Sequence, residues 1–200
     1  MTADGGTPER SRRGRRRDHS KDVAVLEATI KLLATAGIAG TSMDRVAAEA
    51  GISKVTVYTR WPSKSELIGA ALRHLQVDHV PEPVGSARAD LVAHLDAMRR
   101  QYDEVGGMAI VGNCLAEEPL SGDLLATIRR STLLPRRELL AAVVRDGVER
   151  GELAADLDVE RVVSMLLGSL YADHLAGRPT GPGWAEGVVD EFLRRHDRSG

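Results

Sequence analysis

The sequence predicts an all-α fold with two helical units, and its length, composition and hydrophobic spacing support this. The chain has 200 residues, of which 42% are hydrophobic and only 3% aromatic. Ala, Leu, Val and Arg are abundant, whereas the mixture of β-branched and aromatic residues that sheets favour is scarce. Apolar residues recur at helical spacing from Lys21 onward, and no alternating strand pattern interrupts them. Because a usual domain has about 100–150 residues, two units are expected.

The distribution of charge divides the chain in the same way. Residues 1–80 hold 13 Lys or Arg against 9 Asp or Glu, whereas residues 81–200 hold 14 against 20. Residues 10–17 read RSRRGRRR, and we predict that residues 1–20 form a disordered basic arm. Residues 21–80 are then a small helical unit that faces an anionic partner, and residues 84–200 form a larger helical unit.

The small unit begins with a helix from Lys21 that Gly37 can end. Two short segments follow, MDRVAAEA and KVTVYTRW, and then a helix that starts at Ser63-Lys64-Ser65-Glu66 and is stopped by the prolines from Pro81. Thr41 with Asp44 resembles a capping box for the first short segment, and Ser53 can cap the second.

The two short segments meet the requirements of a helix-turn-helix. Ala47 provides a small residue where the helices cross, and Gly51 tolerates the positive φ that the turn needs. Four apolar residues can fill the angle between the helices, namely Val46, Ala50, Ile52 and Val57. The same arrangement occurs in helical proteins that never bind DNA. Whether this chain binds DNA therefore depends on which residues the second helix exposes.

That surface carries no acidic residue. Its outward positions are Lys54, Val55, Thr56, Thr59 and Arg60. Lys and Arg can donate to guanine in a major groove, and the methyl groups of Thr and Val can touch thymine. Tyr58 at the flank and Lys64 at the next helix start are placed to reach phosphates. Together with the basic arm, these residues favour double-stranded DNA as the partner.

The stretch from Thr41 to Tyr58, TSMDRVAAEAGISKVTVY, followed by Trp61-Pro62-Ser63-Lys64, closely resembles the DNA-binding signature of the tetracycline-repressor (TetR) family. The resemblance covers about residues 21–75. It implies a homodimeric, all-helical transcriptional regulator, usually a repressor, that a small-molecule effector releases from its operator. The shape of the remaining helices resembles the ligand-binding and dimerising domain of that family.

The resemblance also implies roles for individual residues. Thr41 and Ser42 would contact phosphate at the start of the second helix, and Arg45 would lie on its exposed side. Many members have Gly or Ala where this chain has Val55, and an aromatic or His pair where it has Arg60-Trp61. The operator sequence therefore does not carry over.

The larger unit is predicted to contain helices over residues 87–105, 108–118, 122–150 with a kink at Pro135, 159–176 and 184–196. The last two have broad apolar arcs, which predict a four-helix interface between two protomers; the alternative is that both helices complete a monomeric core. The interface candidates are Val163, Leu166, Leu167, Leu170, Val188, Val189 and Phe192.

A cavity for the effector is expected among the four helices before the last one. Its candidate lining residues are Met98, Tyr102, Met108, Cys114, Met165, Tyr171 and His174. Met and Tyr at helical spacing are also common core residues, and a single thiol is more often inert than a sensor.

Other classes of function find little support in the sequence. It has no Gly-rich phosphate loop, no paired-histidine zinc motif and no Gly-x-Ser-x-Gly elbow, so we expect neither an enzyme nor a metal or cofactor. One cysteine and no apolar run of membrane-spanning length fit a cytoplasmic protein without a membrane role. Two alternatives stay open: a DNA binder that no ligand controls, and a helical protein-interaction module.

Overall fold

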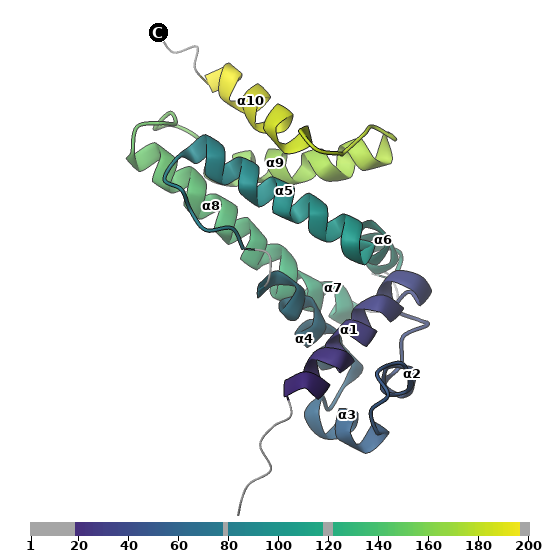
Figure 1. The fold of residues 1–200 in the computed structure, drawn as a ribbon. Coiled ribbons are helices and arrows are strands. Elements are labelled where there is room, and N and C mark those ends of the chain that lie inside the picture. The colour runs from purple at the N-terminus through teal and green to yellow at the C-terminus, as the bar shows by residue number, and fades with distance from the viewer. Residues whose placement is uncertain (1–18, 78–79, 118–121, 197–200) are drawn as a thin grey trace, which may run out of the picture.

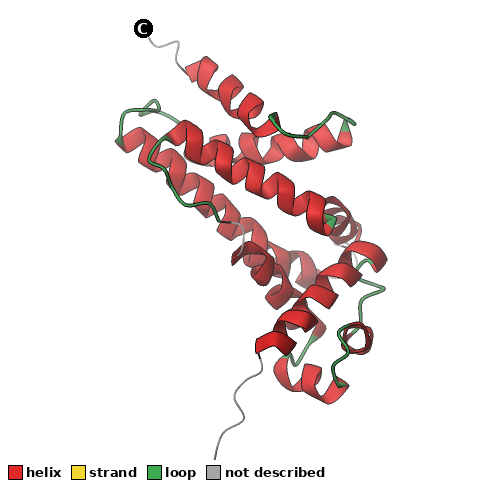
Figure 2. Ribbon diagram, viewed as in Figure 1, coloured by secondary structure: helices red, strands yellow, loops and turns green. Residues whose placement is uncertain are grey.

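The computed structural model describes residues 19–77, 80–117 and 122–196. Every regular element in these ranges is a helix, with no strand among them (Figure 2), and this confirms the predicted all-α class. The basic arm predicted for residues 1–20 lies almost entirely outside the described residues.

Four helices make up the N-terminal part. They are α1 (His19–Ala36), α2 (Met43–Glu49), α3 (Lys54–Arg60) and α4 (Lys64–Val77). Gly37 follows α1 with a φ of 65°, a left-handed conformation that suits the residue after a helix. The predicted order of one helix, two short helices and a further helix is confirmed.

Serine side chains cap three of these helices. Ser53 accepts a hydrogen bond from the Thr56 amide at 3.3 Å, and Ser63 accepts one from Glu66 at 3.1 Å, as predicted. The cap of α2 is Ser42 and not Thr41, since the Ser42 hydroxyl accepts from the Arg45 amide at 3.2 Å. Thr41 and Ser42 are adjacent residues with hydroxyl groups, and the second of them caps the helix.

The C-terminal part contains the remaining helices. They are α5 (Ala87–Val105), α6 (Gly107–Glu117), α7 (Gly122–Ile128), the π-helical turn η1 (Arg129–Leu133), α8 (Leu134–Glu149), α9 (Val159–Leu175) and α10 (Trp184–His196). The helix predicted over residues 122–150 is therefore divided. Pro135 lies in the first turn of α8, where its missing amide proton costs little, and the irregularity falls in the wider turn just before it.

Figure 1 shows α1, α2 and α3 at one end of the molecule and α9 and α10 at the other, with α5 and α8 running between them. Helix α5 packs against α8 and α10, and α8 packs against α9. The main core fills the space among these four helices, where Leu91, Leu95, Val144 and Val163 have no solvent exposure.

A second core connects the two ends of the molecule through α4. Ile68 and Leu72 on α4 pack with Leu33 of α1 and also with Ile110 of α6 and Ile128 of α7. Gly69 faces α7 so closely that an added Cβ would lie 3.1 Å from the side chain of Thr127. This second core therefore contains residues from both sides of the boundary that the sequence placed near Pro81.

Candidate nucleic-acid interface and effector cavity

The turn between α2 and α3 has the geometry that the sequence predicted. Gly51 adopts a φ of 65°, and the Ile52 amide donates to the Ala47 carbonyl at 2.9 Å. Val46 on α2 and Val57 on α3 are each 0% exposed. The inner faces of the two helices thus form a core that fixes α3 relative to α2.

Ion pairs attach the two short helices to α1. Arg60 at the end of α3 forms an ion pair with Asp22 near the start of α1, and both side chains are about three-quarters buried. Lys31 of α1 donates to Glu49 of α2 at 2.5 Å. The orientation of α3 is therefore set at its last turn and at its junction with α2, and most of its outer surface is exposed among the described residues.

The outer surface of α3 exposes residues that have no role in the core. Val55 is 77% exposed and Tyr58 is 50% exposed, although both side chains are large. Thr59 is exposed and donates from its hydroxyl to the Val55 carbonyl at 2.6 Å, while Thr56 is half-buried beside Ser53. An apolar and hydroxyl-bearing surface of this kind is suited to thymine methyl groups and base edges.

Lys54, at the start of α3, is exposed but not without a partner. Its ammonium group donates to the Asp44 carboxylate of α2 at 2.6 Å. This hydrogen bond and the charge of Asp44 raise the pKa of Lys54 above its ordinary value. Both side chains are at least half exposed, so water screens the pair and a phosphate or a base edge can replace Asp44.

Three of the residues predicted to contact DNA have partners within the chain. Thr41 is 2% exposed and donates to the Gly37 carbonyl at 2.7 Å, so its hydroxyl is not available to phosphate. Arg60 points toward α1 because Asp22 attracts it, which corrects its predicted place on the groove-facing surface. Lys64 is half-buried and donates to the Ile38 carbonyl, so it joins the start of α4 to the loop after α1. Ser42 and Arg45 are exposed, as predicted.

The C-terminal part contains a cavity of about 840 Å³ among α5, α6, α7 and α9. This volume lies within the usual range of small-molecule sites, about 300–1,000 Å³. Of the predicted lining residues, Tyr102, Met108, Tyr171 and His174 contribute to its wall. Leu170, which the sequence assigned to a protomer interface, lines it as well.

Met98 and Met165 do not line this wall. Met98 is 3% exposed and belongs to the main core, and Met165 is 52% exposed on the outer side of α9. The side chain of Cys114 lies outside the described residues. Sequence reasoning also missed Gln101 and Arg136 next to the cavity, although a glutamine on the apolar stripe of Leu91, Leu95 and Met98 was a usable signal.

Most residues predicted to join two protomers are instead core residues of one protomer. Val163 and Val189 are 0% exposed, Leu166 is 1%, Leu170 is 2% and Phe192 is 5%. Leu167 is also buried, and Val188 is half-buried. Val163, Leu167, Leu170 and Val189 are core residues of one protomer, which corrects their interface assignment, whereas Leu166, Val188 and Phe192 also line a groove between α9 and α10.

Within the described ranges no group of three or more His, Cys, Asp or Glu is placed to hold a metal ion. Among the same residues, no helix is both long enough and apolar enough to cross a membrane.

Comparison with known proteins links both parts of the chain to one family. Residues 25–71 match the model of bacterial regulatory proteins of the tetR family, and residues 81–192 match the tetracyclin repressor-like C-terminal domain. The DNA-binding transcriptional repressor TetR of Mycobacteroides abscessus is 30% identical, with 88% of this chain and 94% of that protein covered. The transcriptional regulator YdeS of Bacillus subtilis is 28% identical over 80% of this chain and 81% of its own. The crystal structure of the TetR-family regulator SCO0332 superposes with a TM-score of 0.69 at 29% identity, covering 88% of this chain and 97% of that one.

A helix-turn-helix with an exposed second helix, joined to a helical domain with a cavity, defines a DNA-binding transcriptional regulator. With family models matching both of its parts, the chain belongs to the TetR family. Members of this family bind operator DNA as dimers, and control by a small molecule is typical of them. The relatives are regulators and not enzymes.

Proposed function

We propose that this protein is a homodimeric repressor that reads its operator with α3 and leaves it when a small molecule occupies the cavity among α5, α6, α7 and α9. The outer surface of α3 carries this proposal. Val55 and Tyr58 are large side chains exposed to solvent on a helix whose inward residue Val57 is 0% exposed, and the protomer gains no stability from that exposure.

The residues proposed to act on DNA follow from their exposure. Lys54, Val55, Thr56 and Thr59 would meet base edges, and Tyr58 would hold a phosphate. Ser42 and Arg45, exposed at the start of α2, would hold the backbone as well. In a dimer the two α3 helices would be separated by about 34 Å, or a multiple of it, so that both enter major grooves on one side of the duplex.

The proposed dimer uses the outer sides of α9 and α10, which keep Val188 of the predicted set and add exposed residues in place of its fully buried ones. A groove of about 550 Å³ runs between these helices and is lined by Met165, Ser169, Trp184, Gly187 and Val188 among others. A Cβ added at Gly187 would meet no atom within 4 Å, so this side of α10 is open in the protomer. A second copy of the same groove would cover the exposed Met165.

Release by an effector requires that the cavity communicates with α4, the helix that adjoins the DNA-binding end. Ile128 lines the cavity and also packs in the core that contains Ile68 and Leu72 of α4. Gln101 of α5 donates from its amide to the Leu75 carbonyl in the last turn of α4. A ligand that favours a different position of α5 or α7 would move α4, and it would shift the population only by its difference in affinity for the two positions.

The test is an electrophoretic mobility shift assay, with footprinting, on the DNA upstream of the protein's own gene. The proposal predicts a protected site with two half-sites, and excess unrelated DNA should not compete. Binding of every DNA with similar affinity would favour a non-specific DNA binder, and absence of binding at low salt would favour a protein-interaction module. We place the protein in the cytoplasm, where its DNA target would be.

A further inference from the structure

Two tyrosines place a pair of hydroxyl groups in a largely apolar cavity wall. The hydroxyl groups of Tyr102 on α5 and Tyr171 on α9 lie 2.6 Å apart, and their rings meet edge to face with centroids 5.9 Å apart. Each hydroxyl has one proton, and one of the two protons is used in the bond between them. The pair therefore has one proton left to donate to another group.

A positive charge lies directly behind this pair. The guanidinium carbon of Arg136 is 5.5 Å from the centre of the Tyr102 ring. Arg136 also lines a hollow of about 40 Å³ that shares Tyr102, Val111, Ile128 and Leu133 with the cavity wall. The charge is thus separated from the cavity by one layer of side chains.

The charge of Arg136 is not compensated by a carboxylate among the described residues. Its Nη2 donates to the Gln101 side-chain carbonyl, a neutral acceptor, and its buried Nη1 has no hydrogen-bond partner in the part of the chain that the structure describes. A buried guanidinium whose charge is not balanced by a carboxylate attracts an anion across the single layer of side chains that separates them, because charges interact strongly where water is excluded.

The other charged groups around the cavity do not cancel this effect. Asp103 also lines the wall, but its carboxylate accepts from Arg99 at 2.9 Å and is 62% exposed. His174 lies at the exposed end of the wall. The remaining lining residues are apolar or neutral, so the two formal charges nearest in sequence or contact to Tyr102 are Asp103, which Arg99 already pairs, and Arg136, which no carboxylate among the described residues pairs.

We propose that the cavity selects molecules with an apolar, ring-sized body and an anionic head group such as a carboxylate, whose head lies at the Tyr102 and Tyr171 hydroxyls and faces Arg136. This inference rests on the proposed function, because it names the class of effector for that same site. The free hydroxyl proton of the tyrosine pair donates to the head group, and Arg136 provides the opposite charge. The apolar wall formed by Met108, Leu125 and Leu170 holds the body.

The experiment measures binding of three probes with the same body by isothermal titration calorimetry on the full chain without DNA. The probes are naphthalene-2-carboxylate, its primary amide and naphthalen-2-ylmethylammonium, and a biphenyl set repeats the test with a larger body. We expect the carboxylate to bind about tenfold or more tightly than the amide, and the ammonium to bind most weakly. In Arg136→Gln the preference for the carboxylate should disappear, and Arg136→Lys should keep part of it.

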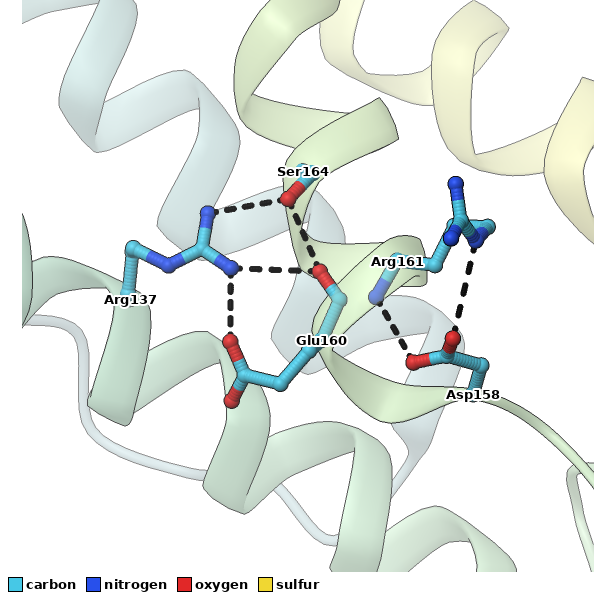
Figure 3. Close-up of polar contacts among 5 residues, drawn as sticks. All are labelled: Arg137, Asp158, Glu160, Arg161 and Ser164. Atoms are coloured by element: carbon cyan, nitrogen blue, oxygen red, sulfur yellow. Dashed lines mark hydrogen bonds and ion pairs between the residues drawn. The ribbon is translucent and has the colours of Figure 1, made fainter.

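The neighbouring Arg137 provides a matched control. Figure 3 shows its side chain reaching from α8 to the start of α9, where it donates to Ser164 at 3.0 Å and to the Glu160 carboxylate at 2.6 Å, and Arg137 is not among the residues that line the cavity. Arg137→Gln should leave the preference for the carboxylate probe unchanged. Tyr171→Phe should weaken binding of the carboxylate probe several-fold. Thermal melting of each variant shows whether it is folded.

Two results would overturn the inference. Equal affinity of the three probes would show that the cavity selects only for the apolar body and not for the charge of the head group. Absence of binding by every probe would show that the cavity does not accept an aromatic anion. Neither result bears on operator binding, because the mobility shift assay tests that separately, with none of the three small-molecule probes present. Failure of the inference and failure of the proposed function are therefore distinguishable.

Discussion

Replacement of the buried amide of Gln101 by leucine should destabilise the protein by about 2–4 kcal/mol. Gln101 is 3% exposed, accepts a hydrogen bond from Arg136 and donates one to the Leu75 carbonyl. A hydrogen bond to a charged group contributes about 1.5–3 kcal/mol, and a neutral one about 0.5–1.5 kcal/mol. Leucine nearly preserves the volume of the side chain, so the lost stability comes from these two hydrogen bonds and not from a cavity.

The measurement is equilibrium unfolding in urea, followed by circular dichroism. With a slope of about 2 kcal/mol per molar urea, the midpoint should fall by about 1–2 M. The same replacement at the adjacent Arg100 is the control, since that side chain is 54% exposed and pairs with Asp96 on the surface. Arg100→Leu should cost about 1 kcal/mol or less. Equal losses in the two variants would refute the reasoning that the buried amide joins α5 to α4 and α8.

Three further predictions concern the dimer, the turn and the acid stability. Met165→Glu should give monomers by light scattering while the protomer stays folded, because the side chain is 52% exposed; a dimer that persists would place the interface elsewhere. Gly51→Ala should cost about 1–2 kcal/mol in urea unfolding through strain alone, since its φ is 65° and the new Cβ meets no atom; an unchanged midpoint would contradict this. Arg88 lowers the pKa of Asp190 below its ordinary value of 3.8, so the stability that this carboxylate contributes is complete above that pH and is lost as the pH falls below it. Asp190→Asn should therefore flatten the decrease in unfolding midpoint between pH 5 and 3, and an identical pH profile would argue against the pair.

The order and boundaries of most helices could be predicted because local signals determine them. Ser53, Ser63 and Gly51 act within a few residues of themselves, and the structure uses each of them as predicted. The range 184–196 was predicted for the last helix, and α10 has the same bounds. The division of residues 122–149 was missed because a π-helical turn leaves no distinct pattern in the sequence.

The functional surfaces were predicted less well because they depend on what covers a helix. The apolar stripe of α9 indicates a buried face, but its spacing does not show whether another protomer or α5 and α8 of the same chain covers it. Val163 and Leu166 turned out to be covered by the same chain. Arg60 was misplaced for a similar reason, since its partner Asp22 is 38 positions earlier in the sequence. The outward side of α3 was predictable because its inward positions are fixed by the turn.

Selection of operator sequences from a random DNA pool, followed by sequencing, tests the role of α3 most directly. Wild type would be compared with Val55→Ser, Lys54→Ala and Tyr58→Phe, all exposed positions at which the fold should tolerate the change. The account predicts that the first two variants select different bases at a few positions of each half-site. Tyr58→Phe should select the wild-type site with lower affinity. Identical base preferences in all four proteins would show that the exposed face of α3 does not read the operator.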